Sequence, residues 1–247
     1  MRRTLWIGAL ALLAFASILL ARFPAAWAVG ALPRDWSCDG VDGTLWNGTC
    51  SALMLRHQQL IGDLSWQLHP ARLLAGRLAA HVELTQAGDF VNGDVELAPG
   101  GRLFARAVHA SMHLHPALLP QLPRDLGGTA RADLERVEMK SGRLADLRGR
   151  IEAHDLVQTG DVTTALGSYA LAFSGAGADG ALVGELRDLG GPLAVQGTLR
   201  MTPEPGFVLD GQVTPRASAA ANLVQQLQML GAPDAQGRRS FSIANTF

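Results

Sequence analysis

The sequence predicts a mainly β protein: an N-terminal transmembrane helix, then a long, curved, mostly antiparallel meander sheet, with one amphipathic helix near the C-terminus. Three observations support this class. The first thirty residues are almost entirely apolar, apolar and polar residues alternate from Ser51 onward, and Gly- and Pro-rich turns separate the alternating runs. Alternation with period two is typical of half-buried strands, and short turns between strands favour antiparallel neighbours.

The N-terminal segment has the features of a single membrane anchor. No charged residue occurs between Leu5 and Ala21, and Arg2 and Arg3 precede this run. The run is close to the minimum length of a spanning helix, and arginines on the short side predict that this end stays in the cytoplasm. We therefore expect residues 1–28 to form a short cytoplasmic tail and an anchor, and residues 29–247 to form an exported β domain.

A cleaved signal peptide is the alternative interpretation of the same segment. Ala26-Trp27-Ala28 has the small-x-small form that a signal peptidase accepts. Against cleavage, the apolar run exceeds the usual core of a signal peptide, and Arg22 with Phe23-Pro24 interrupts the path to the cleavage site. Both interpretations export the same domain.

The rest of the chain consists mostly of alternating runs. Leu103 to Leu114 and Leu144 to Leu156 are the longest of them, and a closing strand is expected through Phe241 and Ile243. The other predicted strands lie near residues 51–56, 60–68, 77–85, 91–97, 128–135, 169–173, 181–186 and 193–201.

Helical spacing is confined to a few short segments of the exported part. Apolar residues recur at helical intervals from Ala217 to Leu230, and Gly231 supplies a C-terminal stop. Single helical turns are expected over Ala71 to Ala75 and within residues 116–123. The helix ending at Leu230 is therefore the one amphipathic helix that we predict after the anchor.

Two cysteines, Cys38 and Cys50, flank a turn that contains Gly43 and Gly48. A hairpin folded there would bring the two thiols together, so we expect a Cys38–Cys50 disulfide formed in an oxidising compartment. Two separate buried thiols are the alternative. The spacing does not suit zinc, which would need further ligands nearby.

The sequence shows no arrangement of catalytic residues, so we expect no enzymatic activity and no cofactor. His109, His113 and His115 share one face of a predicted strand and could approach a metal, but the opposite face is cleanly apolar, which makes them the solvated side of that strand. We therefore predict no metal site. A formal net charge of -1 without a clustered basic surface also excludes a nucleic-acid binder.

The stretch from Val41 to Leu78 organises the predicted domain. Gly43, Thr44, Leu45, Trp46 and Gly48 form a tight turn, and Trp66 and Pro70 follow in the next strand and at its end. Glycines permit positive φ or close backbone approach, and the indole rings can anchor a core. By itself this stretch indicates the packing of a β-hairpin.

The order of these motifs resembles the type II secretion system protein N family of the bacterial general secretory pathway. Besides the turn, the resemblance rests on Leu64-Ser65-Trp66, His69-Pro70, Leu73 to Leu78, Gly197-Thr198-Leu199, Phe207 to Arg216, Leu227 to Gly231 and Gly237-Arg238-Arg239. It favours the anchor over the signal peptide, and it implies a single-pass protein of the bacterial inner membrane whose bulk is periplasmic.

The resemblance also implies a function: a non-enzymatic accessory or scaffold component of the secretion system. Its expected partners are the other components of the inner-membrane assembly platform, extending to the outer-membrane secretin, in support of the export of folded proteins across the outer membrane. No small-molecule substrate is expected. The alternative is a membrane-anchored lipid-binding or lipid-transfer protein that uses the apolar concave face of the sheet; Val82, Leu84, Leu147, Ile151 and Phe173 would then line an open groove.

Overall fold

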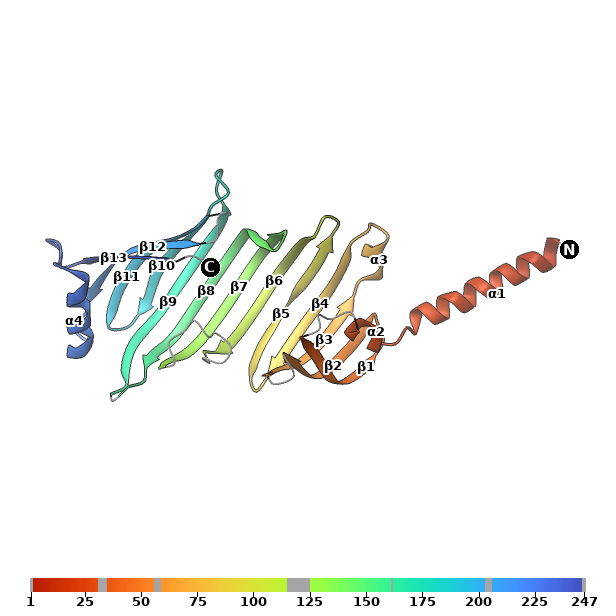
Figure 1. Ribbon diagram of the computed structural model, residues 1–247, viewed down its shortest axis with the longest axis horizontal. Coiled ribbons are helices and arrows are strands. Elements are labelled where there is room, and N and C mark those ends of the chain that lie inside the picture. The colour runs from red at the N-terminus through yellow and green to blue at the C-terminus, as the bar shows by residue number, and fades with distance from the viewer. Residues whose placement is uncertain are drawn as a thin grey trace. The chain divides into compact units, whose positions relative to one another are not determined.

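The structure, a computed structural model, describes residues 2–30, 35–55, 59–114, 125–160, 162–202 and 206–245. It is mainly β: thirteen antiparallel strands form an open sheet in which the strand order is the order of the chain (Figure 1). The strands are β1 (Trp36–Gly43), β2 (Asn47–Leu55), β3 (Gln59–Leu68), β4 (Leu78–Gln86), β5 (Asp89–Ala98), β6 (Arg102–His113), β7 (Leu126–Lys140), β8 (Arg143–Gln158), β9 (Thr164–Ala176), β10 (Leu182–Gly190), β11 (Leu193–Met201), β12 (Phe207–Pro215) and β13 (Arg239–Asn245).

The helices are few and, apart from the first, short. They are α1 (Arg2–Ala21), α2 (Ala26–Val29), α3 (Pro70–Leu73), α4 (Ala221–Leu227) and the 3₁₀ helix η1 (Gln228–Leu230). Among the described residues, no helix combines the length and the apolar character needed to cross a membrane.

The meander predicted from the alternation is confirmed, because the strand neighbours in the sheet are neighbours in the sequence. The predicted helix from Ala217 to Leu230 starts later than expected, at Ala221, and continues into η1. The predicted turn after His69 is α3, which Pro70 begins because its missing N–H is one that a first helical turn leaves unbonded. The helical turn predicted within residues 116–123 lies outside the described residues.

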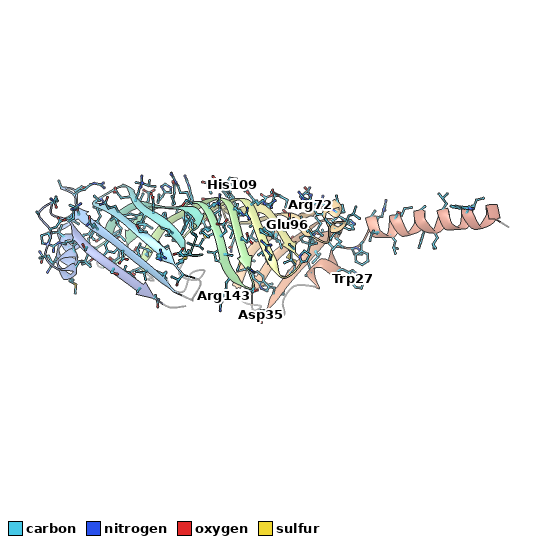
Figure 2. The ribbon with its side chains drawn as sticks, turned by 90° about the horizontal axis from the view of Figure 1, so that it is seen from above. Trp27, Asp35, Arg72, Glu96, His109 and Arg143 are labelled. Atoms are coloured by element: carbon cyan, nitrogen blue, oxygen red, sulfur yellow. A yellow bond between two sulfur atoms is a disulfide. The ribbon has the colours of Figure 1, made fainter. Side chains whose placement is uncertain are left out.

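The chain divides into two compact units. Unit 1 is Met1–Gly88 with Asp94–Glu96, and unit 2 is Asp89–Gly93 with Leu97–Phe247. In unit 1, buried and exposed residues alternate along the start of β2, where Gly48 and Cys50 face inward, and a register shift after Cys50 buries Leu53 as well. Glu96, which is labelled in Figure 2, is buried, and its carboxylate accepts a hydrogen bond from Arg77 at 2.7 Å, which satisfies its charge.

The core of unit 2 lies on one face of its strands. Leu147, Phe173 and Leu182 are buried together, and half-buried apolar side chains of neighbouring strands pack against them: Leu134, Val137, Leu171, Leu199 and Met201. A second cluster forms where α4 covers the strands, with Leu193, Val213, Leu223 and Leu227 buried. Of the apolar positions predicted to share one face of the C-terminal helix, Leu223 and Leu227 are buried, whereas Leu230 is 42% exposed.

The opposite face of unit 2 carries a compact ionic cluster around Phe104. The guanidinium carbons of Arg102 and Arg136 lie 5.1 and 5.8 Å from the centre of the Phe104 ring. The Glu138 carboxylate accepts hydrogen bonds from both arginines, at 2.6 and 3.0 Å. A buried aromatic ring between two cations and a shared carboxylate hold β6 and β7 together on this face.

Acid should weaken this cluster through Glu138. The hydrogen bond from Arg102, and then that from Arg136, holds the pKa of Glu138 below its usual range although burial acts in the opposite direction. Glu138 therefore stabilises the fold above its unfolded pKa, and this contribution is lost as the pH falls through the lowered folded pKa. We expect the unfolding free energy of the natural protein to fall more steeply below about pH 5 than that of Glu138→Gln. Denaturant titrations at a series of pH values measure the unfolding free energy of both proteins. The same dependence of this free energy on pH in both would contradict the prediction.

Candidate functional site: the turn between β1 and β2

The turn between β1 and β2 is built around two glycines that pair across the hairpin. Gly43 and Gly48 face each other, the Thr44 N–H donates to the Asn47 carbonyl at 2.8 Å, and the Asn47 N–H donates to the Thr44 hydroxyl at 3.2 Å. Gly43 has φ of 91°, and a Cβ there would lie 2.5 Å from the Asn47 carbonyl oxygen. Only glycine fits this position.

Trp66 of β3 covers this turn. A Cβ on Gly48 would lie 2.4 Å from the Trp66 ring, so the missing side chain makes room for the indole. The indole N–H donates to the Leu45 carbonyl at 3.0 Å, and the Leu68 N–H donates to the Trp46 carbonyl at 2.7 Å. These bonds satisfy the polar groups of the turn within the chain.

The other side of the turn holds the end of the N-terminal helix. The Trp46 indole N–H donates to the Leu20 carbonyl at 2.7 Å, and the Leu45 N–H donates to the Phe23 carbonyl at 2.7 Å. Ala25, only 2% exposed, donates its N–H to the Gly43 carbonyl. The turn therefore joins α1 to the strands of unit 1, a role that the sequence motifs did not reveal because these bonds leave no periodic pattern.

The two cysteines lie directly below the turn in β1 and β2. Cys38 and Cys50 are joined by a disulfide, with their Cα atoms 5.8 Å apart, and Cys50 is fully buried. The bond links the two strands whose turn holds α1. A covalent link at this place restricts the unfolded chain and keeps the hairpin closed.

Replacing both cysteines with serine should lower the unfolding free energy by about 2–3 kcal/mol, because the closed loop is short. Reduction of the natural protein should have the same effect, and reduction of the double variant should have none. Denaturant titration measures the unfolding free energies, and mass spectrometry after alkylation tests directly whether the two thiols are bonded. Labelling of both thiols before reduction would contradict the disulfide.

Pro70 and the segment after it form a second exposed feature of unit 1. The His69 N–H donates to the Ala79 carbonyl at 2.8 Å, which fixes the start of α3 against β4. Leu74, which follows α3, is 93% exposed, and Leu73 is 42% exposed. Two consecutive exposed leucines offer apolar surface that a partner could cover, so this segment is a candidate contact. The alternation of the strands gave no signal for it.

The predicted row of histidines is paired with carboxylates. His109 Nδ1 lies 2.7 Å from Asp133, and His113 Nδ1 lies 2.6 Å from Asp89 (His109 is labelled in Figure 2). His115 lies outside the described residues. Within the part of the chain that the structure describes, no group of three His, Cys, Asp or Glu side chains is placed to hold a metal ion.

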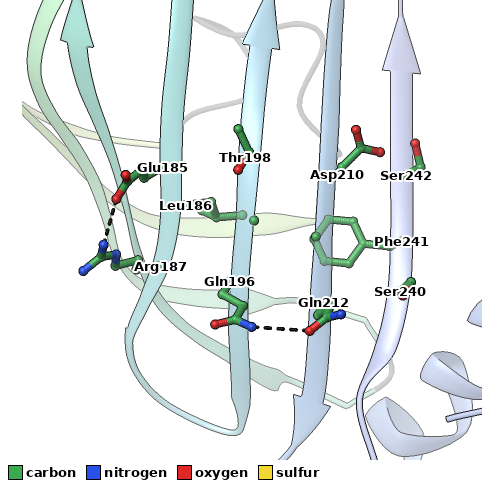
Figure 3. A pocket seen from close by; sticks show the side chains of 12 residues that line it. Glu185, Leu186, Arg187, Gln196, Thr198, Asp210, Gln212, Ser240, Phe241 and Ser242 are labelled. Atoms are coloured by element: carbon green, nitrogen blue, oxygen red, sulfur yellow. Dashed lines mark hydrogen bonds and ion pairs between the residues drawn. The ribbon is translucent and has the colours of Figure 1, made fainter. Parts of the chain in front are cut away.

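A hollow of about 1080 Å³ lies over β10 to β13 on the polar side of unit 2 (Figure 3). Gln196 donates to Gln212 across it at 3.3 Å, and Arg187 pairs with Glu185 at 2.7 Å. These two pairs link four of the lining side chains to one another, and neither histidine nor cysteine is among the lining residues. The hollow therefore offers hydrogen-bonding side chains, among them the hydroxyls of Thr198, Ser240 and Ser242.

The C-terminal motif closes the end of unit 2 through Arg216. Its guanidinium donates to the Gly191 and Leu193 carbonyls at 3.0 and 3.1 Å and to Asp188 at 2.6 Å. Burial opposes the charge on Asp188, but the hydrogen bonds from Arg216 and the Val195 N–H hold its pKa below the usual range. Arg216 thus fixes the turn between β10 and β11 next to α4, a role that the sequence did not indicate.

Comparison with known proteins identifies the family. The model of the family "Type II secretion system (T2SS), protein N" matches residues 34–242. The chain belongs to this family. The type II secretion system protein N of Aeromonas hydrophila is 27% identical over 252 residues, covering 96% of each chain. That of Vibrio cholerae serotype O1 is 34% identical over 85 residues, covering 33% of each chain. No solved structure matches.

The family resemblance read from the motifs is thereby confirmed, and the chain is a component of the type II secretion system. Membership of such a machine implies contact with its other components. The match begins before β1 and ends within β13, so it includes the turn, the disulfide strands and the Arg216 motif.

Proposed function

We propose that the chain is a non-enzymatic accessory component of the type II secretion system, associated with its inner-membrane platform and supporting the export of folded proteins across the outer membrane. The observation that carries this proposal is the turn between β1 and β2, which belongs to the family match and holds the end of α1 through Leu20 and Phe23. A sheet tied in this way to an apolar helix can present its strands to neighbouring components at a membrane surface.

We propose further that α1 attaches the chain to the inner membrane, with its N-terminus in the cytoplasm and the strands in the periplasm. The described apolar side chains of α1 are exposed, as at Trp6 (71%), Leu12 (70%) and Phe15 (65%), and a lipid surface would cover them. The disulfide supports an oxidising compartment for the strands.

The packing after α1 favours a retained segment over cleavage near Ala28. Pro24 forms a bridge with Thr44, and Ala25 is buried, so removal of residues 1–28 would take both contacts away. The intact mass of the protein purified from membranes would distinguish the two: the full mass of 26.1 kDa supports the anchor, and loss of the N-terminal segment refutes it.

The exposed Leu74 supplies the sharpest test of partner binding. In cells that produce the full chain from its own locus, Leu74→Asp should greatly reduce the recovery of platform components in detergent pull-downs, because an apolar contact would receive a charge. The matched control is Val162→Asp, at a residue that is 73% exposed in unit 2. Both changes should leave the melting temperature unaltered, since surface substitutions cost little. Equal recovery with both variants would refute Leu74 as the contact.

The lipid-carrying alternative is tested in the same preparation. Of the residues expected to line a groove, Leu147 and Phe173 are buried in the unit 2 cluster, and Ile151 is 36% exposed. Native mass spectrometry of the detergent-purified protein should therefore show secretion components without retained lipid. A stoichiometric phospholipid and no protein partner would instead support lipid carriage.

A further inference from the structure

The last strand of unit 2 has one open edge. β13 pairs with β12 from Arg239 to Asn245, and among the described strands none pairs with its other side. Ser240 and all residues from Ser242 onward in β13 are exposed. An edge strand presents a row of backbone donors and acceptors to any strand that can align with it.

This edge lacks the features that usually prevent pairing. Residues 240–245 contain no charge and no proline, and the register with β12 is continuous, without a bulge. β1, at the other end of the strand order, differs: it carries Asp39 and Asp42, and the segment after α1 contacts it where Ala25 donates to the Gly43 carbonyl. Charges, prolines and covering segments are the devices that block edges, and β13 beyond Arg239 has neither a charge nor a proline.

We propose that β13 pairs antiparallel with β13 of a second copy of the chain, around a two-fold axis at Ser242. Residues directly opposite each other in an antiparallel pair point to the same face, and so do the two copies of any one residue. Opposite residues are therefore an even number of positions apart, and the axis lies between the two copies of a single residue. Ser242 is the middle residue of the seven in β13, so this register pairs the strand over its whole length.

The side chains of β13 are complementary in this register. Phe241 of each copy lies opposite Ile243 of the other, and Ser240 lies opposite Ala244. Pairs of an aromatic and a β-branched residue stabilise antiparallel strands. Ile243 is 52% exposed in the single chain, and pairing would cover it. The two Arg239 residues lie at opposite ends of the pair, so no like charges meet.

Other registers fit less well. An axis at Phe241 shortens the pair and places Arg239 opposite Ile243, and an axis at Ile243 also shortens it while placing Asn245 opposite Phe241. With the axis at Ser242, the strand pairs over its whole length, apolar residues lie opposite apolar residues, and like charges stay apart. This agreement at a single register is the reason to choose a second copy as the partner of this edge. Because a single strand pair is a small contact, we expect a reversible dimer whose population increases with protein concentration.

Cysteine cross-linking of the full chain in detergent tests the register. In Ser242→Cys the two new thiols would face each other across the axis, so mild oxidation should give a band of twice 26.1 kDa on non-reducing gels. Ser240→Cys is the control, because its thiol would face Ala244. The natural cysteines do not interfere, since they are bonded to each other. No linked dimer from Ser242→Cys, or equal linking of both variants, would overturn the proposal.

Charge pairing tests the same axis without oxidation. Ser242→Asp and Ser242→Lys each place like charges opposite one another, so the dissociation constant of either dimer in sedimentation experiments should rise about three- to tenfold. An equimolar mixture of the two variants should regain the affinity of the natural chain as a heterodimer. A natural chain that stays monomeric at every concentration, or a dimer that neither charge affects, would overturn the proposal, as would a different protein bound at this edge.

Discussion

Phe173→Ala is expected to lower the unfolding free energy by about 3–5 kcal/mol, the cost of removing a buried aromatic ring. Phe173 is 7% exposed and packs with Leu147 and Leu182 at the centre of unit 2. Its ring lies over Gly184 of the neighbouring strand, where a Cβ would approach it to 2.7 Å. The backbone on that side belongs to a paired strand and cannot collapse into the space left by the ring.

Denaturant unfolding followed by circular dichroism measures this loss. The control is Ile151→Ala, because Ile151 is 36% exposed and loses less contact with its neighbours. We expect the control to cost about 1 kcal/mol. A loss of similar size in both variants would mean that the cluster around Phe173 is no more tightly packed than the rest of that face.

Gly48→Ala is expected to cost about 3–4 kcal/mol, at the upper end of the penalties for overpacking. The new methyl group would lie 2.4 Å from the Trp66 ring and 2.9 Å from the Thr44 carbonyl oxygen, so both an indole and a backbone group must move. Moving them breaks the turn that holds α1, so the contact between Trp46 and Leu20 should be lost too.

The control for this prediction is Gly40→Ala in the neighbouring strand β1. A Cβ on Gly40 would meet Ser51 at an ordinary 3.5 Å, so this change should be nearly neutral. The double variant Gly48→Ala/Trp66→Leu replaces the indole with a smaller side chain. Its loss of unfolding free energy should be less than the sum of the losses in the single variants, because the two side chains compete for one space. Additive losses would show that the clash with Trp66 is not the cause.

The sequence predicted most of the strands, because most of them bury one face more than the other; it did not indicate β12. In β6, His109 and His113 are exposed while Val108 and Ala110 are half-buried, as the alternation indicated. The hairpin around Gly43 was predicted from the turn residues themselves, and the pairing of its two cysteines from their positions on either side of the turn. The curvature of the sheet stays a prediction.

The phase of the alternation was harder to predict because bulges shift it. Leu134 and Val137, three residues apart, both pack against the unit 2 cluster, since the register of β7 with β8 shifts between Leu134 and Arg136. A bulge inserts a residue and moves all later side chains to the other face. Contacts between distant segments, such as Trp46 with Leu20 or Arg216 with Asp188, leave no local pattern at all.

The strand order has a consequence for how the protein is made. Each strand pairs with the one that was synthesised just before it, so a hairpin can close as soon as its second strand has emerged. Within unit 2, growth from β6 toward β12 needs no segment that has yet to be translated, and α4 then covers the last strands before β13 is added. The strands of the nascent chain can therefore pair one after another from the N-terminal side, so that long unpaired strands, which could aggregate, exist only briefly.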